Sequence, residues 1–195
     1  MRRGRLVGAV LVGVVLALCL AAGCAVSGTP VAVSDPAPSG APSTRPREIR
    51  LDGIDPCTLL TEEQKKQLGL TERSVLSVTN ERVYKGVTRL CSTRGERPRS
   101  IAVGVTLVMT AGMEIFTPDA VRGTLAPLRT HGFPGLQLVS PEYPEACTVI
   151  VDVAAGQLLD VQFRDGGGRA TVPQPELCAG ARQATDLVMT SLLSR

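Results

Sequence analysis

The stretch CTVIVDVAAGQLLDVQFR, residues 147–164, decides the fold. Apolar residues recur at every second position on each side of a short central segment, which is the pattern of strands that bury one face. Gly156 suits a tight turn, because glycine adopts the backbone angles that such turns need. We therefore expect a β-hairpin with strands at Cys147–Val153 and Leu158–Arg164 that turns at Ala154–Gln157.

Two carboxylates, Asp152 and Asp160, lie on adjacent strands of this expected hairpin. Paired carboxylates are the catalytic groups of glycosidases. The apolar neighbours of these two residues occupy the buried face, so we expect both carboxylates to face solvent. The sequence therefore gives them no catalytic role.

Similar signals outside the hairpin define the remaining elements. Ile101, Val103 and Val105 alternate with smaller or polar residues in the clearest further strand. Thr61 and Gln64 match a capping box at the start of a helix, and Gly69 supplies its stop. The expected strands are Val75–Thr79, Val87–Ser92, Ser100–Thr110 and Leu136–Val139; the expected helical segments are a turn at Pro56–Leu60, helices at Glu62–Leu68 and Thr117–Leu125, and a final helix that opens at Pro175. We expect Gly132, Pro134 and Gly135 to form a loop.

The last expected helix is amphipathic. Its apolar residues recur with helical spacing, so they form one face that can pack on a sheet. These residues are Leu177, Ala181, Ala184, Val188 and Leu192. The pattern predicts an α+β domain, with an antiparallel β-sheet flanked by short N-terminal helices and a longer C-terminal helix.

The N-terminus, MRRGRLVGAVLVGVVLALCLAAGC, has the layout of a bacterial export signal. An arginine-rich start precedes a charge-free apolar run, and small residues then lead to Cys24. Leu20–Cys24 resembles a lipobox, in which the cysteine is joined to diacylglycerol and the chain is cut just before it. Two acyl chains hold a protein stably on a bilayer, whereas one holds it weakly. We expect a signal peptide at residues 1–23 and a lipid anchor at Cys24, on the extracytoplasmic face of the cell membrane.

The segment after Cys24 reads as a tether. Residues 24–50 are rich in proline, alanine and serine, and they show no apolar periodicity. Such a segment buries too little apolar surface to offset the entropy of ordering it. We expect a disordered spacer over residues 24–50 and one globular domain over residues 51–195.

Four cysteines lie in the expected domain, at positions 57, 91, 147 and 178. An even number of cysteines in an exported chain predicts disulfides, here two. Four cysteines allow three pairings. We favour Cys91–Cys147, which would join neighbouring strands, and Cys57–Cys178, which would link the opening and closing helical segments.

The motif Asp-Pro-Cys-Thr-Leu-Leu at Asp55–Leu60, with Gly69-Leu70 after the next helix, carries a resemblance. Together with the lipobox and the four cysteines, it resembles a family of exported lipoproteins from high-GC Gram-positive bacteria, a domain family of unknown function. The resemblance covers roughly Asp52 to Leu193. It implies a membrane-anchored α+β domain and transfers no activity and no catalytic residues.

Charge and motif content exclude several function classes. Lys plus Arg number 21 and Asp plus Glu 18. Without Arg2, Arg3 and Arg5 the balance is 18 to 18, so we expect no nucleic-acid partner.

The sequence shows no metal site. His131 is the single histidine, and the cysteines lack zinc-type spacing, so we expect no metal and no cofactor. No serine lies in a nucleophile-elbow motif. The cluster of Arg94, Arg97 and Arg99 is expected to be a solvated loop.

These observations favour a non-catalytic binding module of the cell envelope. The expected partner is a small molecule, a lipid, a wall polymer or an envelope protein. An apolar concavity lined by residues such as Val105, Leu107, Phe116 and Phe163 would support ligand binding. The alternatives are an accessory subunit of an envelope complex and a cell-envelope hydrolase that uses His131, Asp152 or Asp160.

Overall fold

The computed structural model describes residues 44–195, except for residues 82–83, 97–98 and 169. The expected signal peptide, Cys24 and most of the expected tether lie outside the described residues. In the part of the chain that is described, no helix is both long and apolar enough to cross a membrane.

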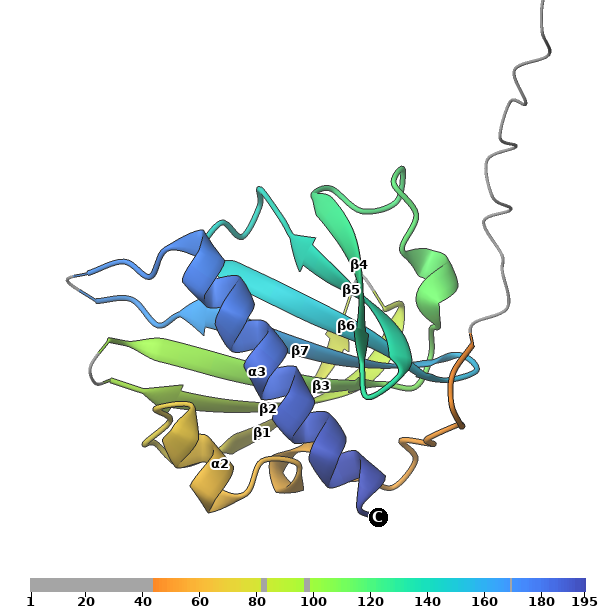
Figure 1. Cartoon of the computed structure of the whole chain (residues 1–195), viewed down its shortest axis with the longest axis horizontal. Helices are drawn as coiled ribbons and strands as arrows, with labels where there is room; N and C mark the ends of the chain where they lie inside the picture. Colours follow the sequence, from red (N-terminus) through yellow and green to blue (C-terminus); the bar gives the residue numbers. More distant parts are fainter. Residues whose placement is uncertain (1–43, 82–83, 97–98, 169) are drawn as a thin grey trace, which may run out of the picture. The chain divides into compact units, whose positions relative to one another are not determined.

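Seven strands form one antiparallel sheet in the order β1-β2-β3-β7-β6-β5-β4 (Figure 1). Two meanders compose it, one from β1 to β3 and one from β4 to β7, and the pairing of β3 with β7 joins them. The strands are β1 Val75–Glu81, β2 Gly86–Gly95, β3 Ile101–Val108, β4 Thr124–Thr130, β5 Phe133–Val139, β6 Ala146–Ala154 and β7 Gln157–Asp165. The α+β prediction and the central hairpin are therefore confirmed.

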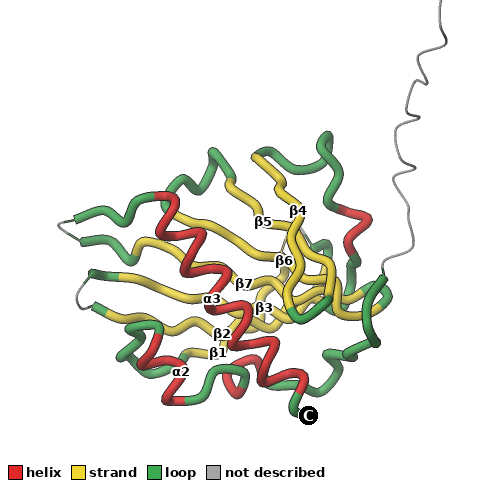
Figure 2. Tube along the Cα trace, viewed as in Figure 1, coloured by secondary structure: helices red, strands yellow, loops and turns green. Residues whose placement is uncertain are grey.

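Helix α3, Gln174–Leu193, covers one face of the sheet and packs on β6 and β7 (Figures 1 and 2). The five apolar residues predicted to form its inner face are all buried, at 2% exposure or less. Against them lie the odd-numbered residues of the central strands, such as Val105, Val149 and Val161. Strand alternation and helical periodicity thus meet in one core, as the sequence predicts.

The predicted N-terminal caps are present. The Asp55 carboxylate accepts a hydrogen bond from the Cys57 amide at the short helix η2, Pro56–Thr58. Thr61 and Gln64 form a reciprocal capping box at α2, Glu62–Gln67. These short helices lie on the same side of the sheet as α3, at the β1–β2 end (Figure 2).

The segment predicted to be a helix at Thr117–Leu125 is instead one turn followed by a strand. The amides of Ala120 and Val121 both bond to the Thr117 carbonyl, and β4 then begins at Thr124. The helix prediction is wrong because Gly123 has φ +145°, a conformation outside the helical region. The only other helical structure between β3 and β4 is the single-turn η3, Met113–Ile115.

The predicted loop around Gly132 is a tight β-hairpin that joins β4 to β5. Its turn residues His131 and Gly132 have φ values of 49° and 83°, as a two-residue turn of the I′ type requires. Pro127 is tolerated in β4 because β4 is an edge strand. Pro134 precedes the part of β5 that pairs with β6, so its missing N–H breaks no bond to β6.

The four domain cysteines form two disulfides, but the favoured pairing is wrong. The bonds are Cys57–Cys91 and Cys147–Cys178. Cys91 lies on β2 and Cys147 on β6, with β3 and β7 between them. Three strand steps of about 4.8 Å separate these two positions, far beyond the roughly 7 Å that a disulfide spans. Each real bond instead ties a strand to the helix above it, η2 to β2 and α3 to β6.

Ordered contacts begin before the expected domain boundary at Leu51. Ile49 is buried and its amide bonds to the Val153 carbonyl at 2.8 Å. Arg45 forms a 2.5 Å ion pair with Asp152, whose side chain is 4% exposed. Asp152 therefore does not face solvent, contrary to the prediction. Arg45, near the end of the expected tether, thus supplies an opposite charge to this buried carboxylate.

We predict that Arg45→Met destabilises the domain. The change removes the ion pair of a buried carboxylate, which costs about 2 kcal/mol or more in free energy of unfolding. Urea unfolding of the full chain measures it. Arg47→Met is the matched control because Arg47 is exposed and, among the described residues, its side chain bonds to the Leu193 carbonyl alone. In an Asp152→Asn background, Arg45→Met should cost clearly less. Equal losses for both arginine variants would contradict this role of Arg45.

Candidate functional site

A groove of about 750 Å³ lies on the sheet face opposite α3. Its floor is formed by even-numbered residues of β2, β3, β7 and β6, because successive residues of a strand point to opposite faces. These are the smaller and polar residues that alternate with the buried apolar ones. The strand pattern that builds the core on one face therefore also builds the groove on the other.

The register arranges the floor in three cross-strand rows. The first row is Arg94, Ala102, Arg164 and Ala146; the second is Ser92, Gly104, Gln162 and Thr148; the third is Leu90, Thr106 and Asp160. Ile150 continues the third row on β6 but is fully buried and does not line the groove. Positive charge thus lies at one end of the floor and a carboxylate nearer the other. Between them the floor carries hydroxyl and amide groups.

Gly104 has no side chain, which leaves the space above the middle of the floor open. It lies in β3 between Ser92 and Gln162, where any side chain would rise into the groove. A Cβ at this position would meet only the flexible end of Leu90, at 3.2 Å. The backbone therefore does not require glycine here, and the open space above Gly104 belongs to the groove.

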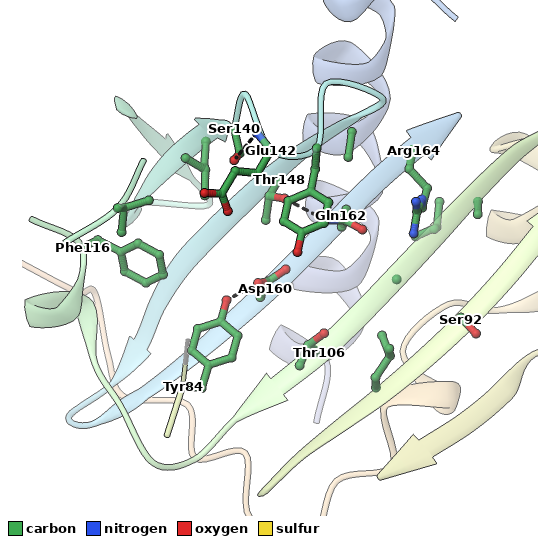
Figure 3. A pocket seen from close by; sticks show the side chains of 18 of the residues that line it. Tyr84, Ser92, Thr106, Phe116, Ser140, Glu142, Thr148, Asp160, Gln162 and Arg164 are labelled. Atoms are coloured by element: carbon green, nitrogen blue, oxygen red, sulfur yellow. Dashed lines mark hydrogen bonds between the residues drawn. The ribbon is translucent and has the colours of Figure 1, made fainter. Parts of the chain in front are cut away.

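Connecting segments supply the walls. Strand β4 lies at the edge of the second meander, so the chain from β3 must pass β7, β6 and β5 to reach it. Phe116, Val121 and Arg122 of this connection line one side of the groove. Ser140, Glu142 and Tyr143, between β5 and β6, line another part. Figure 3 shows Phe116, Ser140 and Glu142 around the floor residues.

Tyr84 closes the carboxylate end. It lies in the turn between β1 and β2, and its carbonyl accepts a 3.0 Å hydrogen bond from the hydroxyl of Thr110, two residues after β3. Its hydroxyl donates to the Asp160 carboxylate (Figure 3). Its ring meets Phe116 edge-on, with ring centroids 6.4 Å apart. These contacts form part of a small apolar cluster with Val108, Ile150 and Leu158.

Exposed ion pairs lie at the rim. Arg164 pairs with Glu145 at 3.0 Å, and Arg122 lies 3.8 Å from Glu142, with all four side chains at least 41% exposed. Such exposed pairs contribute little to stability. Within the described residues, no hydrogen bond or ion pair engages the side chain of Arg94.

The candidate residues from the sequence do not converge on one site. Asp160 lies in the groove, Asp152 lies with Arg45, and His131 lies in the β4–β5 turn with its ring 3.2 Å from the Asp186 carbonyl. No group of three or more potential metal ligands occurs among the described residues. Of the three predicted arginines, Arg94 lines the groove, Arg99 pairs with Glu176, and Arg97 falls outside the described residues.

The anticipated apolar concavity is not the one observed. Val105, Leu107 and Phe163 lie on the other face, in the core beneath α3. Of the four residues named for it, only Phe116 lines the groove. The observed groove has a polar floor. Ser92, Gln162 and Arg164 belong to it, and sequence reasoning did not single them out, although their even-numbered positions between buried residues carried the signal.

A comparison with protein families now places the chain. A family model described as "Protein of unknown function (DUF3558)" matches residues 19–191. The chain belongs to this family. The match spans the groove and all four domain cysteines, so it confirms that this is a domain family of unknown function. No curated protein and no solved structure gives a significant match.

We predict that Tyr84→Phe destabilises the carboxylate end of the groove. The change removes the hydrogen bond to Asp160 and keeps the ring that packs on Phe116, so the expected cost is about 1–2 kcal/mol in free energy of unfolding. Urea unfolding measures it. Tyr143→Phe is the matched control because Tyr143 is 57% exposed. A loss for the control equal to that for Tyr84→Phe would argue against a special role of the Asp160 contact.

Proposed function

We propose that this DUF3558 protein is an exported lipoprotein of a Gram-positive cell envelope whose domain binds a ligand without catalysing a reaction. The observation that carries the binding role is the groove of about 750 Å³, which falls within the size range of small-molecule sites. The two disulfides support export, because such bonds persist in oxidising compartments.

The N-terminal pattern supports the anchor. The arginine-rich start and the apolar run have the layout of an export signal, and the lipobox-like segment that ends at Cys24 supports acylation of that cysteine. A diacylated cysteine supplies the two chains that stable attachment needs. Lipid attachment would keep the groove at the outer surface of the cell membrane, where it meets envelope molecules.

The location of the sequence's candidate catalytic residues favours binding over hydrolysis. A general base must reach the reacting group directly or through one water molecule. His131 does not line the groove, and Asp152 is engaged by Arg45. Asp160 is the carboxylate on the groove floor, where Tyr84 donates to it.

An accessory subunit of an envelope complex is the second candidate function. Strand β1 is an edge strand, and large apolar side chains are exposed on it and on its neighbour β2. These are Val75, Leu76, Val78 and Val87, at 43–65% exposure. Exposed apolar edges are surfaces on which another chain can add a strand. Crosslinking in intact cells that returned only the monomer would count against this candidate.

Cys24→Ala tests the anchor. We expect the variant to lose labelling by radioactive palmitate and to leave the processed membrane fraction, because the acylated thiol is absent. Cys19→Ala is the matched control, since Cys19 precedes the expected cleavage site. Palmitate labelling that persists in Cys24→Ala would refute the proposed anchor.

Gly104→Phe tests the groove. A phenylalanine at this position fills the floor between Ser92 and Gln162, so we expect any molecule that co-purifies with the protein from its native membrane to be lost. Native mass spectrometry of the full chain detects it, and Gly168→Phe is the control because a Cβ there makes only an ordinary 3.5 Å contact with Ser100. A bound molecule retained in Gly104→Phe would contradict a ligand site in the groove.

A further inference from the structure

We propose that the groove binds an acidic glycan, a chain of hydroxyl-bearing sugar units whose carboxylate or phosphate lies between Arg94 and Arg164. This inference rests on the proposed function and adds the class of ligand. It is drawn from the three rows of the floor and from the charges and aromatic rings at the rim.

Arg94 and Arg164 are placed to hold one anion. They lie in the same cross-strand row with Ala102 between them. Two strand steps of about 4.8 Å separate their Cα atoms by roughly 10 Å, and both side chains are long enough to reach a shared point. Ala102 carries only a methyl group, so nothing on the floor blocks that point. Guanidinium groups bind carboxylates and phosphates with paired hydrogen bonds.

The charge at this end is available to a ligand. The Arg94 side chain is exposed, and among the described residues it has no acidic partner. The exposed pair between Arg164 and Glu145 can exchange its carboxylate for that of a ligand at little cost. Arg122, on the wall of the groove, lies near Glu142, which also lines the groove, so the anion position depends on Arg94 and Arg164.

The second row favours a ligand with hydroxyl groups. Ser92, Gln162 and Thr148 present hydroxyl and amide groups to the floor. The Gln162 amide donates to the Thr148 hydroxyl at 3.4 Å, and each of these groups has the capacity for further hydrogen bonds. An acyl chain on this floor would cover those groups without bonding to them, which is unfavourable. Sugar hydroxyls can satisfy them, so the floor selects a polyhydroxylated body over a lipid tail.

Aromatic side chains flank the floor. Tyr143 is 57% exposed and lines the groove, and Phe116 also lines it but is buried, at 8% exposure, against Tyr84. A sugar ring has apolar C–H faces as well as hydroxyl edges. An exposed tyrosine offers an apolar surface and a polar tip, and this combination matches such a ring.

Three probes separate the parts of the proposal. Glucose 6-phosphate carries hydroxyls and an anion, glucose carries hydroxyls alone, and hexanoate carries an anion with an alkyl chain. Calorimetric titration into the full chain in lipid nanodiscs measures each affinity. We expect glucose 6-phosphate to bind at least tenfold more tightly than either other probe, because the site engages both groups at once.

Arginine variants test the anion position. Arg94→Gln and Arg164→Gln should each weaken glucose 6-phosphate binding about tenfold, the effect of losing one charge-assisted hydrogen bond. Arg50→Gln is the matched control, since it removes the same charge from a residue that pairs with Asp52 outside the groove. We expect it to leave the affinity unchanged.

Several results would overturn the inference. Equal affinities for glucose and glucose 6-phosphate would exclude a role for the anion, and hexanoate binding as tight as that of glucose 6-phosphate would indicate a lipid site. Weakening by Arg50→Gln as large as by Arg94→Gln would indicate non-specific charge effects. If no sugar probe binds although a co-purified molecule is lost in Gly104→Phe, the ligand class is wrong while the proposed function stands.

Discussion

The pairing of β3 with β7 is the constraint on which the structure depends. Each meander alone is a sheet of three or four strands with an unprotected edge, and this pairing joins the two into one sheet. It brings the alternating residues of both meanders into common rows. One face then carries the valines and leucines that α3 covers, and the other carries the groove. The core and the groove are therefore two consequences of a single register.

Much of the fold is predictable because the alternation of apolar and polar residues in strands and the capping residues of helices are local signals. The β6–β7 hairpin, strands β1 to β3, the capping box at Thr61 and the inner face of α3 all follow from residues close in sequence. Of the β4–β5 hairpin, the sequence predicts only Leu136–Val139 of β5 as a strand, because the prolines of the other segments argue against strands. Their tolerance depends on β4 being an edge strand and on Pro134 lying beyond the β6 pairing, and both facts concern strand order.

Strand order also explains the failures at the cysteines and at the site. Sequence reasoning placed Cys91 and Cys147 on neighbouring strands, whereas two strands separate them. Likewise, Arg94 and Arg164 are far apart along the chain, and only the β2-β3-β7 order places them in one row. The burial of Asp152 could not be predicted from its neighbours in the sequence. Its partner Arg45 lies in a proline-rich segment with no apolar pattern, and only the folded structure brings the two together.

Disulfide mapping tests the strand order most directly. Trypsin can separate all four cysteines, because Lys65, Arg94 and Arg164 lie between successive members of the set. Mass spectrometry of the non-reduced digest of the full chain should show peptides that join Cys57 to Cys91 and Cys147 to Cys178. A peptide that joins Cys91 to Cys147 would require β2 and β6 to be neighbours. That result would contradict the β3–β7 pairing and, with it, the groove.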